Sequence, residues 1–326
     1  MNTGSALFME LREEELRACV LHYLGQPLLS WELLRGGLFN TTYRLDLPDK
    51  SVILRLGPVN RHLLLPYEQG LMGCEPVIQQ LLRSRGIPTS KTLAIDLERK
   101  LLDRDIAIVE LIPGINMTAT VLDEDTQYSV CRRAGELTRV IHGITARDLP
   151  SPPEKLFGRA SAVLAGKGSS SWKKAMLSEL QQWRDCARTA QTFSDAEIRR
   201  FCTCFEYFSW AFDAVTEPCL VHGDLWYGNI LIDAEGSLVA IIDADRAYFG
   251  DPEFDLMLPW MPRVPFMEGY GDTGSAADPV LRRELYRMLL CLEDCYILQM
   301  EYRNTQSFLE AKEDALRRLS VLENRI

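Results

Sequence analysis

The pattern of apolar and polar positions divides the chain into a strand-rich first part and a mostly helical second part. Residues 10–24 carry apolar side chains at helical spacing and stop before Gly25, which predicts an amphipathic helix. Short apolar or β-branched runs follow, separated by Gly, Pro and Asp. They predict five strands, two within 31–47 around a glycine turn and one each at 51–57, 92–96 and 106–112, with a helix at 66–84 between the third and the fourth.

After Pro113-Gly114 helical spacing dominates, and it predicts helices at 126–142, 172–190, 195–215 and 278–323. The exception is a hairpin, with strands at 230–233 and 238–242 joined across Ala234-Glu235-Gly236. Residues 151–171 are rich in Pro, Gly and Ser and are predicted to be irregular and mobile. This layout predicts an α+β, bilobal protein, with a first domain at 1–112 and a second at 113–326.

Composition narrows the possible partners. The chain has 326 residues, 47% of them hydrophobic, and a net charge of −10. A nucleic-acid binder would show a basic face, so we expect no nucleic-acid partner; a cationic small molecule is compatible with this charge. There is no run of eighteen apolar residues and no basic segment leading into an apolar one at the start, so no membrane partner is expected. Nine scattered cysteines are typical of reduced thiols, and we expect a cytoplasmic monomer or homodimer.

The segment from Cys219 to Asp255 carries the candidate chemistry, because it holds six aspartates, one asparagine and one histidine around two strand-like runs. Carboxylates are costly to hold close together without a cation. Asp224 and Asn229 lie five residues apart in a loop, Asn229 opens the hairpin, and its second strand ends at Asp243. The hairpin therefore returns Asp243 to Asn229, which predicts a pair of hard oxygen ligands for Mg²⁺.

Asp224 is then left to accept a hydrogen bond from an acceptor hydroxyl. One aspartate that orients a nucleophile, together with an asparagine and another aspartate that hold magnesium, is the arrangement needed for phosphoryl transfer. The alternative is that these residues are ordinary turn formers, since Asp, Asn and Gly are common in turns. The H-x-D loop with Asn229, the aspartate after the hairpin and the G-D-P-x-x-D segment occur in order, and together they favour the chemical interpretation.

The motif "HGDLWYGN", followed by "IIDADRAYFGDPEFDL", resembles the aminoglycoside phosphotransferase family. That family is a branch of the protein-kinase-like fold and is related to choline, fructosamine and homoserine kinases. The resemblance implies that Asp224 is the catalytic base and that Asn229 and Asp243 bind Mg²⁺. It also implies that His222 braces the catalytic loop and that Asp255 holds this loop by hydrogen bonds to its backbone.

A nucleotide, ATP or GTP, is expected to bind in the first lobe, beneath the hairpin "GGLFNTTYRL". Gly36 and Gly37 let the backbone approach phosphate closely, and Asn40 and Thr41 add possible donors. This is not the G-x-G-x-x-G loop of protein kinases. Taken alone, the segment is a simple hairpin turn.

The third strand departs from the protein-kinase pattern, because Arg55 stands where a phosphate-binding lysine is expected. Arginine can also bind phosphate, so the role is compatible with the change. The family's spacing favours Glu75 over Glu68 as its partner; alternatively, Arg55 is a surface strand residue. The connection "VELIPG" resembles a kinase hinge, in which Glu110 and Ile112 offer main-chain groups to the purine.

The acceptor is expected on the side of the second lobe, near five further residues: Trp226, Tyr227, Asp245, Trp260 and Glu268. Aromatic faces suit sugars or cations, and acids suit ammonium groups. The sequence thus predicts a nucleotide- and Mg²⁺-dependent kinase of a small hydroxylated molecule, with an aminoglycoside or another antibiotic preferred. A metabolite kinase of the choline, homoserine, fructosamine or sugar type is the first alternative. A nucleotide-binding module without turnover is the second.

Overall fold

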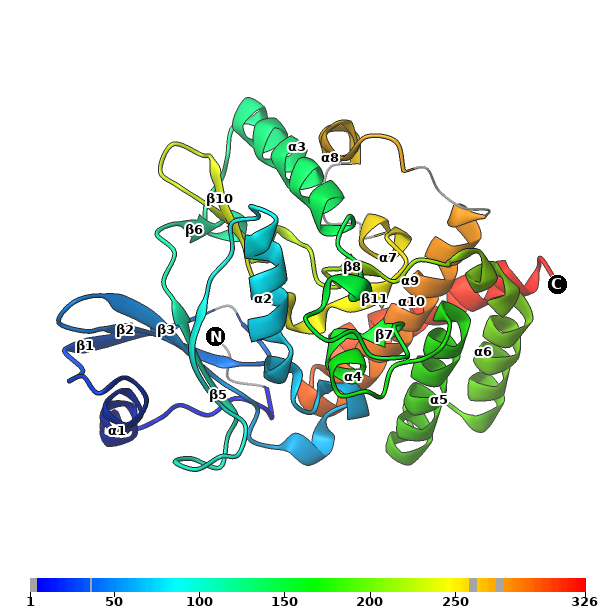
Figure 1. Ribbon diagram of the computed structural model, residues 1–326. Coiled ribbons are helices and arrows are strands. Elements are labelled where there is room, and N and C mark those ends of the chain that lie inside the picture. Colours follow the sequence, from blue (N-terminus) through cyan, green and yellow to red (C-terminus); the bar gives the residue numbers. More distant parts are fainter. Residues whose placement is uncertain (1–4, 36, 258–262, 274–277) are drawn as a thin grey trace.

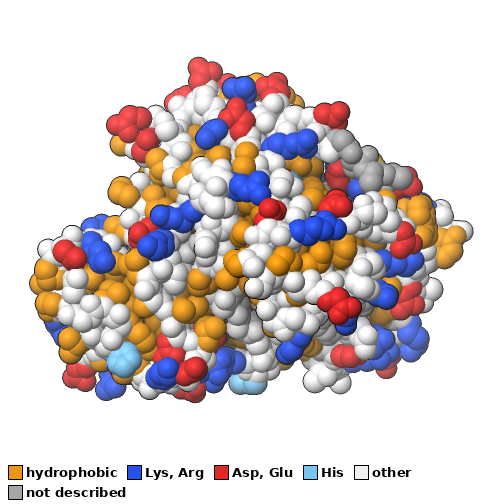
Figure 2. All heavy atoms as spheres, viewed as in Figure 1, with side chains coloured by type: hydrophobic (Ala, Val, Ile, Leu, Met, Phe, Trp, Pro, Cys, Tyr) orange, Lys and Arg blue, Asp and Glu red, His pale blue; other side chains and the backbone are white. Residues whose placement is uncertain are grey.

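The computed structural model describes residues 5–35, 37–257, 263–273 and 278–326. It has two lobes (Figure 1), one built on an antiparallel sheet and the other mainly helical. The predicted α+β, bilobal architecture is confirmed. No helix in these described ranges is long and apolar enough to cross a membrane. On the face shown in Figure 2, acidic and basic side chains are interspersed.

The first lobe contains a five-stranded sheet in the order β1-β2-β3-β5-β4, and every neighbouring pair is antiparallel. Apolar residues of β2, β3 and β5 alternate toward helix α1 and form the core of this lobe. Helix α2 lies between the sheet and the second lobe. The elements are α1 (Glu13–Leu24), β1 (Ser30–Leu34), β2 (Thr41–Asp46), β3 (Ser51–Leu56), α2 (Glu75–Ser84), β4 (Thr92–Asp96) and β5 (Ile106–Glu110).

The second lobe packs its helices around buried aromatic residues, among them Trp172 and Trp183. Two small three-stranded sheets, β10-β9-β6 and β7-β11-β8, lie in this lobe and carry the candidate site. The helices are α3 (Glu124–Ile141), α4 (Ala160–Leu164), α5 (Trp172–Ala190), α6 (Asp195–Phe208), α7 (Glu253–Leu256), α8 (Arg263–Tyr270), α9 (Pro279–Tyr296) and α10 (Thr305–Glu323). The strands are β6 (Ile115–Asn116), β7 (Gly158–Arg159), β8 (Cys219–Val221), β9 (Ile230–Ile232), β10 (Leu238–Ile241) and β11 (Tyr248–Gly250).

Three predicted segments differ from the structure. The helix expected at 66–84 begins only at Glu75, because Gly70, with φ of 81°, interrupts a series of short 3₁₀ turns before it. The helix expected at 278–323 is broken by a π-turn at Ile297–Glu301, and α10 restarts after Asn304, whose side chain caps it. Residues 151–171, predicted as irregular, contain β7 and α4, and Arg159 is buried there.

The connection between the lobes is short. Strand β5 ends at Glu110, and β6 already pairs with β9 of the second lobe. Gly114 permits this approach, because its φ is 159° and a Cβ there would lie 2.9 Å from the Ile232 carbonyl oxygen. The domain boundary between residues 112 and 113 stays a prediction.

Candidate active site

The loop that follows β8 is held in place by one buried carboxylate. Asp255, in α7, accepts hydrogen bonds from the backbone N–H groups of His222 (2.8 Å) and Gly223 (2.9 Å). His142 Nε2 lies 3.0 Å from the same carboxylate. Burial alone would raise the pKa of Asp255, but the hydrogen bond and charge of His142 lower it below its usual value. Asp255 thus fixes the start of the loop, as the resemblance implied.

His222 braces this loop from the inside. Its Nε2 lies 3.1 Å from the Ile242 carbonyl oxygen, and its Nδ1 accepts a hydrogen bond from the Asp224 N–H at 3.3 Å. Burial lowers the pKa of His222, which favours the neutral ring that these two contacts require. Both ring nitrogens are therefore occupied, and the predicted bracing contacts are present.

Asp224 and Asn229 are joined within the loop. Asn229 Nδ2 donates to the backbone oxygen of Asp224 at 2.7 Å and to its Oδ2 at 3.0 Å. Burial raises the pKa of Asp224 to about 7, although the charge of Arg246 acts in the opposite direction. A carboxyl whose pKa lies near neutrality is suited to accept a proton from a hydroxyl.

The hairpin brings the two predicted Mg²⁺ ligands to one place. The N–H of Ile242 donates to the Asn229 carbonyl oxygen at 2.9 Å, so Asp243 directly follows a residue paired with Asn229. Asp243 has a left-handed backbone, with φ of 65°, an uncommon conformation for a residue other than glycine. Because the Asn229 amide nitrogen faces Asp224, its Oδ1 lies on the other side of the amide group. An amide oxygen and a carboxylate in this arrangement fit a hard cation.

Arg55 is surrounded by three carboxylates. Its guanidinium donates to Glu75 (2.5 Å), Asp243 (2.5 Å) and Asp245 (3.0 Å), and its side chain is 9% exposed. Burial alone would lower the pKa of Arg55, but the three carboxylates raise it above its usual value. The predicted contact with Glu75 is present, and Arg55 is not a surface strand residue. One positive charge faces three acidic groups.

Sequence reasoning missed a second arginine at the site, Arg246, whose side chain is 21% exposed and which stands three residues after Asp243. It donates to the Tyr67 hydroxyl at 2.9 Å and to Glu68 Oε1 at 2.8 Å. Its guanidinium also lies 5.4 Å from the centre of the Phe39 ring, at the tip of the glycine hairpin. Glu68, the alternative partner considered for Arg55, is thus paired with Arg246. The position of Arg246 directly after Asp245 is the one signal in the sequence that could have identified it.

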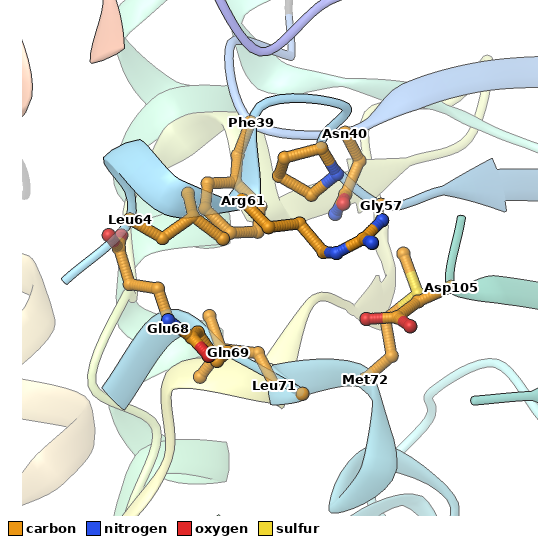
Figure 3. Close-up of a pocket in the computed structure, with 12 residues that line it drawn as sticks. Phe39, Asn40, Gly57, Arg61, Leu64, Glu68, Gln69, Leu71, Met72 and Asp105 are labelled. Carbon is orange, nitrogen blue, oxygen red and sulfur yellow. The ribbon is translucent and has the colours of Figure 1, made fainter. Parts of the chain in front are cut away.

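The glycine hairpin is described only in part, because Gly36 lies outside the described residues. Gly37 and Asn40 precede β2, and Asn40 lines a small pocket beside the hairpin (Figure 3). Thr41 is fully buried; its hydroxyl donates to the Met9 carbonyl oxygen and accepts from Arg104. That hydroxyl is engaged inside the lobe and is not directed to a phosphate.

The predicted hinge residues follow the last strand before the connection. Glu110 closes β5, and its N–H donates to the Lys91 carbonyl oxygen at 2.9 Å. Its side chain lies 3.3 Å from Arg83 at the surface. Ile112 comes two residues later and is half-buried. Their contacts with a purine stay predictions.

The predicted acceptor residues that the structure describes have different contacts. Trp226 is 38% exposed beside Asp224, whereas the Tyr227 hydroxyl accepts from Gln127 and faces α3. Glu268, in α8, accepts from Tyr128. Asp245 is buried against Arg55 between the lobes, and Trp260 lies outside the described residues.

Comparison with known proteins identifies the family of this chain. A profile of the phosphotransferase enzyme family matches residues 30–285. The chain belongs to this family. The prediction of a phosphotransferase that acts on small molecules is confirmed at this level, and the family implies a nucleotide as phosphoryl donor.

Solved structures of the same fold cover almost the whole chain. A thermostable mutant of the aminoglycoside phosphotransferase APH(4)-Ia, in a ternary complex with AMP-PNP and hygromycin B, is 16% identical, with a TM-score of 0.67. The match covers 94% of this chain and 97% of that one. The spectinomycin phosphotransferase APH(9)-Ia, in complex with ADP and spectinomycin, is 20% identical, with a TM-score of 0.58 and coverage of 96% and 98%.

Curated relatives match over shorter stretches. The chloroplastic protein-ribulosamine 3-kinase of Arabidopsis thaliana is 32% identical over 114 residues, which are 33% of this chain and 33% of that protein. The protein of the same name from Oryza sativa subsp. indica is 47% identical over 47 residues, which are 14% of this chain and 13% of that protein. The matched part thus spans a third or less of these relatives.

Proposed function

We propose that this chain transfers the terminal phosphoryl group of a Mg²⁺-bound nucleoside triphosphate, ATP or GTP, to a hydroxyl group of a small molecule. The observation that carries the proposal is the convergence of Asp224, Asn229 and Asp243 at one end of the β9–β10 hairpin. These residues supply a group that can orient a hydroxyl and two oxygen ligands for a cation.

The charges around Arg55 support a cation site next to it. Glu75, Asp243 and Asp245 share a single guanidinium, and burial together with the charge of Asp243 raises the pKa of Glu75 and Asp245, so a further cation beside them would stabilise their charged forms. Asn229 and Asp243 would hold Mg²⁺, which, when bound, neutralises charge on the phosphates. Among the residues that the structure describes, no three His, Cys, Asp or Glu side chains group as a metal-binding cluster. A cation held by few protein ligands completes its shell with phosphate and water, which suits Mg²⁺.

Each residue then has a distinct task. Asp224 accepts a hydrogen bond from the acceptor hydroxyl and orients its oxygen toward the phosphorus. Arg55 lies beside Asp243, within reach of the phosphates of a nucleotide held there. Asp255 and His222 keep the loop in place, so positioning and charge neutralisation provide most of the catalysis.

For the acceptor we propose an aminoglycoside or another antibiotic as the first candidate class. The fold relatives that contain hygromycin B and spectinomycin support it, as does Glu268 on the second lobe. A ketosamine-type sugar amine is the second candidate, supported by the local identity to protein-ribulosamine 3-kinases. A nucleotide-binding module without turnover would bind Mg-nucleotide but release no ADP or GDP with any acceptor.

The test is nucleotide-diphosphate release by the purified chain across these acceptor classes, with Mg²⁺ and each nucleotide. Release that depends on one compound supports the proposal and identifies the acceptor. Absence of release with every member of the panel, although the nucleotide binds, would favour the module without turnover.

A further inference from the structure

Glu301 is a buried acid that the proposed reaction does not use. It ends the π-turn at Ile297–Glu301 and is 0% exposed. Neither of its carboxylate oxygens has a hydrogen-bond partner of normal geometry among the described residues. The side chain that interacts most with its carboxyl is the carboxylate of Glu68, while the charge of Arg246 and the backbone of Leu65 act on it more weakly. Two ionised carboxylates can only accept, so this contact becomes a hydrogen bond only when one of them carries a proton.

The contacts of Glu68 decide which of the two acids is ionised. Its Oε1 accepts from Arg246 Nη2 at 2.8 Å, and its Oε2 accepts from the Leu65 N–H at 3.1 Å. Both oxygens of Glu68 therefore accept from a donor, whereas neither oxygen of Glu301 has a donor of normal geometry. Burial first, and then the charge of Glu68, raise the pKa of Glu301 well above its usual range. The proton therefore resides on Glu301.

The other charged and titratable groups around this pair do not offer Glu301 a free cation. Arg159 is paired with Glu179 (2.8 Å) and Glu293 (3.0 Å), and its guanidinium lies 3.1 Å from the centre of the Tyr67 ring. The guanidinium of Arg246 donates to Glu68. The remaining titratable groups that face the pair are Tyr67, Cys186, Glu293, Tyr296 and Tyr302.

Arg246 connects the Glu68–Glu301 pair to the candidate active site. The charge of Arg246 acts on Asp224, and its guanidinium is oriented by Glu68 and Tyr67. Tyr67 and Glu68 belong to the segment that leads from the sheet lobe into α2, and Glu301 belongs to the helices at the end of the chain. The contact therefore joins the two lobes directly behind the catalytic loop.

We propose that Glu301 in its protonated form donates a hydrogen bond to Glu68 and so holds the Glu68–Arg246 ion pair in place behind the catalytic loop. Glu301 is then a positioning residue for phosphoryl transfer, and this role rests on the function proposed above. The proton shared by Glu301 and Glu68 is a property of the folded chain and needs no substrate.

The shared proton couples folding to pH. In the unfolded chain Glu301 is ionised above its ordinary pKa of about 4.3, whereas the folded chain keeps it protonated. The stability from this group is fully present below that ordinary pKa and declines as the pH rises through the neutral range toward the raised folded-state pKa. Across this range the folded chain holds one proton more than the unfolded chain at this position.

The number of protons taken up on folding follows from the pH dependence of the free energy of unfolding, measured between about pH 6 and pH 9. The test compares this number in the wild type and in Glu301→Gln. A glutamine amide can donate to Glu68 as the protonated acid does, but it does not titrate. We expect the variant to fold with uptake of one proton fewer than the wild type. Unchanged uptake would overturn the proposal. Glu310→Gln, which changes an exposed glutamate of α10 in contact with Gln306, is the control and should keep wild-type uptake.

A second variant separates a shared proton from a general effect of buried charge. Glu68→Gln removes the charge that, after burial, raises the pKa of Glu301, so it should lower this pKa and reduce the proton uptake toward pH 9. Because both variants act on the same proton, the double variant should lose one proton and not two. A loss of two protons in the double variant would show that the two acids titrate independently and would contradict the pair.

Turnover tests the positioning role. Glu301→Gln should keep kcat within about twofold of the wild type. Glu301→Leu, which has no donor, should lower kcat about tenfold with little change in the KM for nucleotide, since Arg246 lies behind Asp224. Wild-type kcat in Glu301→Leu would overturn the positioning role. If the wild type transferred phosphate to no acceptor, the proposed function would fail. The proton uptake on folding would still show whether Glu301 and Glu68 share a proton.

Discussion

Arg55 Nη2 lies 2.5 Å from Asp243 Oδ1, so the third strand of the sheet lobe is bound directly to the last residue of the catalytic hairpin. The same guanidinium holds Glu75 of α2. A single side chain thus links the sheet, helix α2 and the candidate cation site. Arginine suits this role, because its planar group offers several donors in fixed directions, whereas lysine offers one compact charge.

Replacement of Arg55 by alanine tests this link. The change leaves buried carboxylates without their counter-charge, so it should lower the free energy of unfolding by about 3 kcal/mol and abolish binding of Mg-nucleotide. Arg55→Lys should lose less stability but still weaken nucleotide binding. Denaturant titration measures the free energy of unfolding, and calorimetry measures the binding of Mg-nucleotide.

Arg83→Ala, which breaks an exposed pair with Glu110, is the control and should cost less than about 1 kcal/mol of stability. Full nucleotide affinity in Arg55→Ala would contradict the assigned role.

The ionised carboxylate of Asp224 should destabilise the folded chain at and above neutral pH. Burial raises its pKa to about 7, above the unfolded value of 3.8. Its contribution to stability is therefore fully present below the unfolded pKa and is lost as the pH rises through about 7. Asp224→Asn should raise the free energy of unfolding by about 1 to 2 kcal/mol at about pH 8, allowing for solvent screening of this half-buried group, and by less at about pH 5. Thermal unfolding at both pH values measures this gain, and a variant less stable than wild type at the higher pH would contradict it.

Helix α8 rests on α3 through a contact that only glycine permits. A Cβ at Gly135 would lie 2.0 Å from the Phe266 carbonyl oxygen and 2.8 Å from the Tyr270 nitrogen. Gly135→Ala should therefore displace α8, lower the free energy of unfolding by about 1 to 3 kcal/mol, and raise the KM for the acceptor, because α8 carries Glu268. Steady-state kinetics and chemical denaturation check both effects.

Ser129→Ala, on the exposed side of α3, is the control and should change stability by less than about 0.5 kcal/mol. If α8 were displaced but the KM for the acceptor stayed unchanged, α8 would not be part of the acceptor site.

The parts of the site that lie close together in sequence were predictable. The hairpin, with Asn229 before it and Asp243 after it, follows from strand periodicity and a turn. The contact between Arg55 and Glu75 followed from the family's spacing. The Arg246–Glu68–Glu301 cluster was not predictable, because its members come from three distant segments and each alone looks like a surface charge. The break at Ile297–Glu301 was also hidden, since the apolar periodicity continues through it.

The acceptor side was the least predictable part. Asp245 and Tyr227 were predicted at the acceptor site; in the structure Asp245 is held by Arg55, and the Tyr227 hydroxyl accepts from Gln127 of α3. Their proximity to Asp224 in sequence did not reveal their direction, because short turns such as 227–229 and 244–246 rotate successive side chains to different sides.

The central claim is that Asp224 orients an acceptor hydroxyl for phosphoryl transfer, and one measurement tests it most directly. Release of ADP or GDP would be followed with Mg²⁺ and each nucleotide across aminoglycosides, other hydroxylated antibiotics, ketosamines, choline, homoserine and sugars. It would be measured for the wild type and for Asp224→Asn. We expect release that depends on a particular acceptor in the wild type and falls at least about 100-fold in the variant, with nucleotide binding retained. Equal acceptor-dependent release by both proteins would contradict the account.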